Sequence, residues 1–175
     1  MLGFSTYAAL LPELRDLWGM SNSQAGIIGG IFFTGYIATV SLWTSLTDRI
    51  DGRYVYLAGG LLATAGGTGF GVLANGFWSA ALFQLLLGTG MAATYMPGLR
   101  LLSDRMSGAA QSRAVSFYTS FFGIGTALSL AIAGFVAPPF GWRAAFVWSG
   151  LGPLVAAGMV FFLIAPSFQA DRPSE

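Results

Sequence analysis

Residues 54–99 read YVYLAGGLLATAGGTGFGVLANGFWSAALFQLLLGTGMAATYMPGL, a run of 46 residues without one charged side chain. A helix that crosses the hydrocarbon core of a membrane takes about 20 residues, because it rises about 1.5 Å per residue through about 30 Å. The run is long enough for two crossings, and Ala74-Asn75-Gly76 in its middle is typical of a turn. This stretch predicts two membrane-spanning helices joined by a short hairpin.

Charge-free runs of similar character fill most of the remaining chain, at residues 17–47, 114–142 and 144–170. They predict an all-α polytopic transmembrane helix bundle with five complete spans plus a partial first helix. Prolines at 97, 138, 139 and 166 favour helix ends nearby, and the polar residues 99–113 predict a short interfacial helix followed by a turn. The five predicted spans are residues 25–46, 54–73, 77–97, 114–136 and 144–165.

The first residues of the chain, 1–11, are apolar but cover only about 15 Å at helical rise, which is too short for a crossing. They are interpreted either as the remnant of a truncated first span or as an amphipathic segment on the membrane surface. Surface segments usually carry Lys or Arg on their polar face, and no basic residue precedes Arg15. The truncated span is therefore the favoured interpretation.

Composition excludes several classes of protein. The chain is 55% hydrophobic and 9% charged, whereas soluble domains carry about 25% charged residues. It has no Cys, His or Lys, so zinc fingers, thiol nucleophiles, Ser-His-Asp triads and Walker-type phosphate loops are excluded. We expect no enzyme activity, no cofactor, no metal site and, with a net charge of +1, no nucleic-acid partner.

The arginines predict the orientation of the bundle. Positive charge is enriched in cytoplasmic loops, and placing residues 48–53 in the cytoplasm puts six of the eight arginines inside. The polar tail, residues 166–175, is then cytoplasmic, and the protein is predicted to be a multi-pass protein of the inner (plasma) membrane. The inside arginines are 49, 53, 100, 105, 113 and 172, and the outside arginines are 15 and 143.

Residues 44–53, TSLTDRIDGR, resemble the loop signature G-x-L-A-D-R-x-G-R between the second and third helices of major facilitator transporters. Thr44 and Thr47 replace Gly and Ala of that signature, and Asp51 is inserted before Gly-Arg. The resemblance implies a conformational-switch loop, in which an acid at a helix end forms charge-assisted contacts with a neighbouring helix terminus. The alternative is a hydrophilic turn that only satisfies topology. The implied switch residues are Asp48, Arg49, Gly52 and Arg53.

Other stretches resemble the same family, so that the resemblance covers the whole chain. Residues 11–26 resemble the outer loop after the first helix, with the stretch Ser21-Asn22-Ser23-Gln24 as N-cap chemistry for the next helix, and residues 95–100 and 141–146 resemble helix ends. The resemblance implies that residues 1–165 are the N-terminal six-helix half of a secondary transporter and that 166–175 begin a cytoplasmic linker. Its implied partners are the lipid bilayer, a small solute and the missing C-terminal half. The alternative function is a non-transporting membrane scaffold or partner subunit.

The candidate substrate cavity lies along the fourth helix of the resemblance. A buried Arg usually stands there four residues before a glycine, and Gln84 and Gly88 occupy that spacing here. An intramembrane polar residue is a site candidate, although an interhelical hydrogen bond would also account for Gln84. Tyr95 shares the helical face of Gln84 and Gly88, and Tyr118 stands in the next span. The substrate-cavity candidates are Gln84, Gly88, Tyr95 and Tyr118.

Two stripes of small residues at helical spacing predict faces of close helix packing. The first stripe comprises Gly59, Ala63, Gly66, Gly67 and Gly71, and the second comprises Ser116, Ser120, Gly123, Ala127 and Gly134.

No acidic residue lies in any predicted complete span. The chain therefore shows no buried carboxylate for proton coupling.

Overall fold

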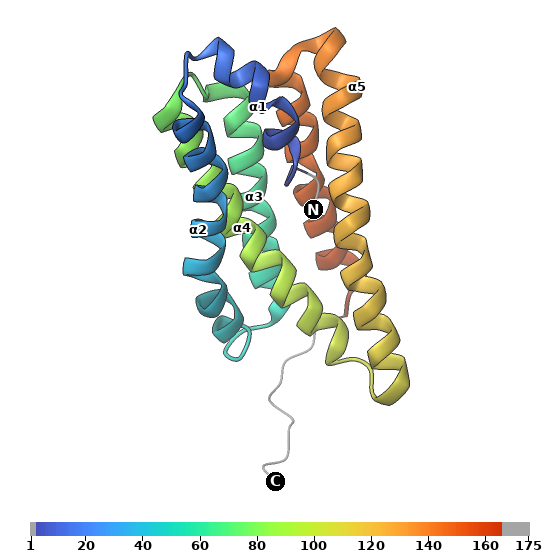
Figure 1. Ribbon diagram of the computed structural model, residues 1–175. Helices are drawn as coiled ribbons and strands as arrows, with labels where there is room; N and C mark the ends of the chain where they lie inside the picture. Colours follow the sequence, from blue (N-terminus) through green and yellow to red (C-terminus); the bar gives the residue numbers. More distant parts are fainter. Residues whose placement is uncertain (1–2, 166–175) are drawn as a thin grey trace.

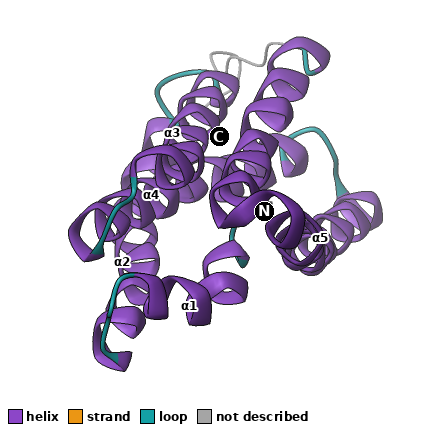
Figure 2. Cartoon of the chain, turned by 90° about the horizontal axis from the view of Figure 1, so that it is seen from above, coloured by secondary structure: helices purple, strands orange, loops and turns teal. Residues whose placement is uncertain are grey.

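The computed structural model describes residues 3–165 of the chain, and Figure 1 shows them as an elongated bundle of helices. Within the described residues there is no β-strand (Figure 2), so the all-α prediction is confirmed. Helices α2 to α5 are each long and apolar enough to cross a membrane. The helices are α1 (Thr6–Leu17), α2 (Asn22–Leu46), α3 (Gly52–Leu73), α4 (Phe77–Ser103) and α5 (Gly108–Leu163).

Helix α5 has 56 residues, more than twice the length of a single crossing. It is interrupted at Gly141, whose φ of 81° and ψ of 161° are not helical. The first half of α5 (residues 108–140) and the second half (residues 142–163) run in opposite directions on the two sides of this break (Figure 1). The positive φ favours glycine, because a side chain would meet its own backbone there. Helix α5 therefore supplies two antiparallel spans.

Proline ends fewer helices than the sequence predicts. Helix α4 continues through Pro97 to Ser103, and a turn at residues 104–107 replaces the predicted interfacial helix. Pro138 and Pro139 also lie inside α5, two and three residues before the break at Gly141. A proline removes one backbone hydrogen bond, and packed neighbours in a membrane-type bundle let the helix continue. The prediction of a helix end was therefore wrong at Pro97, whereas the span that contains Pro138 and Pro139 does end nearby, at Gly141. Pro166 lies outside the described residues.

The N-terminal segment also departs from its prediction. A loop was expected from residue 11 onward, but α1 is helical to Leu17 and includes Pro12. Tyr7, Leu10 and Leu14 recur every three or four residues and are buried, so one face of α1 packs on the bundle. The Tyr7 hydroxyl also donates to the Ala25 carbonyl at 2.8 Å, which ties α1 to the start of α2.

The start of α2 forms as the sequence predicts. Ser21 Oγ accepts from the backbone N–H of Gln24 at 3.2 Å, and the Gln24 side chain accepts from the backbone N–H of Ser21 at 2.9 Å. This reciprocal pair is a capping box, which satisfies backbone N–H groups that a helix start otherwise leaves free.

The small-residue stripe of α3 lets this helix lie in the centre of the bundle, and that packing prediction is confirmed. A Cβ added at Gly66 would lie 2.5 Å from the Leu87 nitrogen of α4, and one at Gly67 would lie 2.7 Å from Cα of Gly150 in α5. Glycine is required at both positions because the helix backbones approach so closely. Helix α3 therefore packs between α4 and the second half of α5.

The second stripe does not behave in this way. A Cβ added at Gly123 or Gly134 would meet no atom within 4 Å, and Ser116, Ser120 and Ala127 are exposed. Within the described residues, no helix packs on this face of the first half of α5. The predicted packing face has no partner among residues 3–165, so this part of the packing hypothesis stays a prediction.

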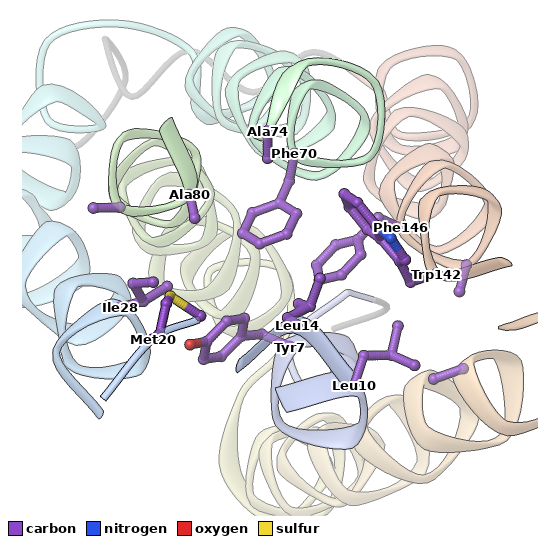
Figure 3. Close-up of a cluster of buried hydrophobic side chains, with 13 residues drawn as sticks. Tyr7, Leu10, Leu14, Met20, Ile28, Phe70, Ala74, Ala80, Trp142 and Phe146 are labelled. Carbon is purple, nitrogen blue, oxygen red and sulfur yellow. The ribbon is translucent and has the colours of Figure 1, made fainter. Parts of the chain in front are cut away.

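The main apolar core gathers beside α1, whose Tyr7, Leu10 and Leu14 belong to it (Figure 3). The rings of Phe70 and Phe146 stack with centroids 4.0 Å apart, and Trp142 stands edge-on to both. Leu14 and Tyr7 of α1 cover this cluster. These contacts close one end of the bundle around α1, α3 and the second half of α5.

A buried chain of hydroxyl groups fixes the residues that precede and start α1. Thr6 Oγ1 lies 3.0 Å from Ser129 Oγ in the first half of α5 and donates to Ser149 Oγ in the second half at 3.0 Å. The backbone N–H of Ser5 donates to Ser129 Oγ at 3.1 Å. These bonds hold Phe4, the preceding residue, inside the bundle.

Candidate functional site

Two adjoining cavities open in the middle of the bundle, below the apolar core. The larger measures about 280 Å³ and the smaller about 200 Å³, and Met91, Tyr95 and Phe122 line both. The larger is lined by Tyr56, Met91, Thr94, Tyr95, Tyr118, Phe121, Phe122, Ile124, Gly125 and Leu128, and the smaller by Phe4, Phe32, Phe33, Tyr36, Met91, Tyr95 and Phe122. We refer to the two together as the aromatic cavity.

Tyr95 and Tyr118, both predicted as cavity residues, meet in this wall. Their ring centroids are 5.5 Å apart, and the Tyr118 hydroxyl donates to the Tyr95 carbonyl at 3.0 Å. Gly98 permits the approach of the first half of α5, since a Cβ there would lie 2.6 Å from the Tyr118 oxygen. A proline at residue 97 withdraws one backbone hydrogen bond from α4 close to this point.

Gln84 and Gly88, the other two predicted cavity residues, lie outside the wall of the aromatic cavity. Gln84 is 3% exposed, and its carboxamide makes no hydrogen bond to any residue between 3 and 165. Gly88 is the point at which α4 meets α2, because a Cβ there would overlap the Phe32 carbonyl. Gln84 lies about three helical turns, and Gly88 about two, from Tyr95 along α4.

The predicted switch loop joins α2 to α4 through Asp48. Its carboxylate lies 2.6 Å from the Arg100 guanidinium near the end of α4. Arg100 also donates to Thr47 Oγ1 at 2.8 Å and lies 3.6 Å from the Asp104 carboxylate. The Asp48 side chain is 59% exposed, so this pair is at the surface of the bundle. The sequence analysis did not identify Arg100 as the partner of Asp48.

The inserted residue of the loop signature has a definite structural role. Asp51 is buried, accepts from the backbone N–H of Arg53 at 2.9 Å, and pairs with the Arg53 guanidinium at 3.0 Å. It thereby caps the start of α3, where Gly52 lies against Leu101 of α4. Arg49 is exposed and makes no ion pair with any described residue.

Arginines also cap the ends of neighbouring helices. The last carbonyls of a helix have no partner within it and carry partial negative charge, so a guanidinium nearby stabilises them. Arg53 donates to the Ile164 carbonyl at 3.0 Å and Arg105 to the Ala165 carbonyl at 2.8 Å, both at the end of α5. At the opposite end of the bundle Arg143 donates to the Gly71 carbonyl at 3.0 Å, at the end of α3.

The bundle has the form of a multi-pass integral membrane protein: its spans are apolar, its arginines lie at the two ends, and its interior holds the aromatic cavity. The chain belongs to the Major Facilitator Superfamily, whose family model matches residues 1–175.

Curated relatives agree with this assignment. The chain is 26% identical over 160 residues to the 4-hydroxybenzoate transporter PcaK of Acinetobacter baylyi, which covers 91% of this chain and 35% of that protein. It is 27% identical over 165 residues to protein spinster homolog 3 of Danio rerio, covering 92% and 33%. It is 25% identical over 144 residues to the niacin transporter NiaP of Acinetobacter baylyi, covering 82% and 33%. The chain thus spans about a third of the length of these relatives.

Most of the cavity residues were not predicted from the sequence. Phe4, Phe32, Tyr36 and Tyr56 come from three separate parts of the chain and meet only in the folded bundle. The available signal was the aromatic content of 15%, which does not say which rings face inward.

Proposed function

We propose that this protein is the N-terminal six-helix half of a secondary transporter that moves a small organic solute across the inner membrane by alternating access. The observation that carries the proposal is the aromatic cavity, which lies midway along the bundle where transporters of this type hold their substrates. Relatives named for transport of 4-hydroxybenzoate and of niacin support the proposal that the solute is a small organic molecule.

The proposal includes a second half that faces the aromatic cavity. The relatives are about three times as long as the matched chain, which leaves room for six further spans. The exposed small-residue face of α5, which includes Gly123 and Gly134, offers a smooth surface against which such a half can rock. Exposure of the cavity would then alternate between the two sides of the membrane.

We place the end of the bundle that carries Asp48 in the cytoplasm. Five arginines of the described chain lie at this end and two at the other, in agreement with the bias of cytoplasmic loops. Arg172 and the proposed cytoplasmic linker, residues 166–175, lie outside the described residues. The five arginines are 49, 53, 100, 105 and 113, and the two are 15 and 143.

Asp48 is the residue that we propose as the conformational switch. An acid at the end of α2 lies close to carbonyls with partial negative charge, which is unfavourable unless it is paired. Arg100 supplies the pair in this conformation. Loss of that contact in the other conformation would let the ends of α2 and α4 separate.

A ligand screen followed by an uptake assay tests the proposed function. The full-length protein is purified, and small organic solutes are screened for those that raise its melting temperature. Solutes that do so are then offered to proteoliposomes that contain the same unlabelled solute. We expect saturable counterflow of at least one solute, and loss of it in Tyr95→Ala. Solute binding without counterflow in any condition would favour the scaffold function instead.

A further inference from the structure

The side chains that line the aromatic cavity limit the kind of solute that it can hold. None of its described lining residues is charged, and its polar side-chain groups are four tyrosine hydroxyls and one threonine hydroxyl. The Thr94 hydroxyl donates to the Met91 carbonyl, and the Tyr118 hydroxyl donates to the Tyr95 carbonyl. Their hydrogens are therefore already engaged.

The hydroxyls of Tyr36, Tyr56 and Tyr95 differ from these two. Among residues 3–165 none of the three makes a hydrogen bond to protein, although each ring is half-buried in the cavity wall. A phenol that leaves water must find an acceptor, because an unmet donor costs about 1–3 kcal/mol. The three hydroxyls therefore favour a solute that presents hydrogen-bond acceptors.

The rest of the wall favours a flat ring. Phe4 and Phe122 stand with centroids 5.3 Å apart, and Phe122 and Tyr95 with centroids 6.1 Å apart. Aromatic rings prefer such offset or edge-on neighbours, and a ligand ring can join the same arrangement. The two parts of the cavity measure about 280 Å³ and 200 Å³, each just below the usual range for ligand pockets, so each part suits one ring rather than several.

We infer that the aromatic cavity binds a small, uncharged, planar ring compound that carries a carbonyl or amide acceptor. This inference rests on the proposed function and names its substrate class. Among the described lining residues an ionised carboxylate would find no cationic partner, and burial of an unpaired charge costs far more than burial of a neutral carbonyl. A quaternary ammonium would be attracted to ring faces but would leave the three phenol donors unmet.

Four probes separate these possibilities in the full-length protein, purified in lipid nanodiscs and studied by titration calorimetry. Benzamide is the neutral ring with an acceptor, benzoate its anion, toluene the ring without an acceptor, and phenyltrimethylammonium the cation. We expect benzamide to bind at least tenfold more tightly than the other three. Binding of benzoate, toluene or the cation as tightly as benzamide would overturn the inference, and so would no binding of any ring compound.

Variants that remove single hydroxyls provide a second measurement. Tyr56→Phe and Tyr95→Phe keep the ring and should weaken benzamide binding several-fold while leaving toluene binding unchanged. Tyr54→Phe is the matched control, because Tyr54 is 53% exposed on α3 and does not line the cavity. Equal benzamide affinity in all three variants would contradict the inference.

The same experiments distinguish the inference from the proposed function. Counterflow of some other solute without binding of benzamide would contradict the substrate class and leave transport standing. Tight benzamide binding without counterflow of any solute would contradict transport and leave the binding site standing.

Discussion

At the residue scale, substitution of Asp48 is the most direct test of the proposed switch contact between Asp48 and Arg100. Replacement by Asn removes the charge that pairs with Arg100 while it keeps the size of the side chain. The pair is exposed, so we expect a loss of stability of less than about 1 kcal/mol. We expect normal insertion, slower turnover and a shift in cysteine-accessibility labelling toward the inward-open form.

The control for this prediction is Asp16→Asn at the other end of the bundle. Asp16 also forms an exposed pair, with its neighbour Arg15, but joins no two membrane spans. Turnover in Asp48→Asn that matches Asp16→Asn, with unchanged labelling, would reduce Asp48 to an ordinary loop residue.

Gln84 poses a different question, because the residue is 3% exposed and its carboxamide makes no hydrogen bond to residues 3–165. Burial of an unpaired amide is costly, so Gln84→Met should raise the melting temperature. If the amide serves transport, the same variant should also lower the rate of uptake per molecule. A thermal melt and an uptake assay measure the two effects, with Leu86→Met on the same helix as the control. A more stable variant with normal uptake would assign Gln84 no role in transport.

At the scale of helices, close packing between α3 and α4 can be tested with glycine substitutions. Gly66→Ala places a Cβ 2.5 Å from backbone of α4, so the helices must move apart, and we expect a loss of about 1–3 kcal/mol. Gly123→Ala is the matched control, because a Cβ there meets nothing within 4 Å. Thermal melts of the two variants should therefore differ by several degrees. Equal melting temperatures would mean that α3 and α4 are not packed this closely.

Orientation is tested by reporter fusions in the connections between helices. Fusions at Gly52 and Gly108 should report the cytoplasm, and fusions at Asn75 and Gly141 the outside, because of the distribution of arginines. An enzymatic reporter active only in the cytoplasm, paired with one active only outside, gives the two readouts. A reporter at Gly108 that is active outside would reverse the proposed orientation.

The helices could be predicted from the sequence where a local feature, such as a charge-free run or a capping pair, decides where they lie. Charge-free runs show which segments are apolar enough to cross a membrane, and the Ser21–Gln24 pair marks a helix start through local bonds. The course of α4 through Pro97 could not be predicted in this way, because the effect of a proline depends on neighbours in the folded bundle. The pairing of Asp48 with Arg100 likewise joins residues 52 positions apart.

At the scale of the whole molecule, side-chain contacts hold the helices of the described chain together at both ends of the bundle. At one end the Phe70–Phe146 stack and the hydroxyl chain of Thr6 hold α1 against α3 and α5. At the other end Arg53, Arg100 and Arg105 connect helix ends to one another. Between them lies the aromatic cavity, which is lined by rings with no described charge. Such a unit suits movement largely as a rigid body, with the proposed loss of the Asp48–Arg100 contact confined to the ends of α2 and α4.

The arginine caps at the end of α5 bear on how the protein is made. Arg53 and Arg105 leave the ribosome well before residues 164 and 165, whose carbonyls they hold. Until those residues are synthesised, the two guanidinium groups lack these acceptors, although Arg53 has Asp51 as a partner and Arg105 has the Leu101 carbonyl. These two contacts therefore form only after residues 164 and 165 have been synthesised. In pulse-chase proteolysis, Arg53→Gln should insert at a normal rate but acquire protease resistance late.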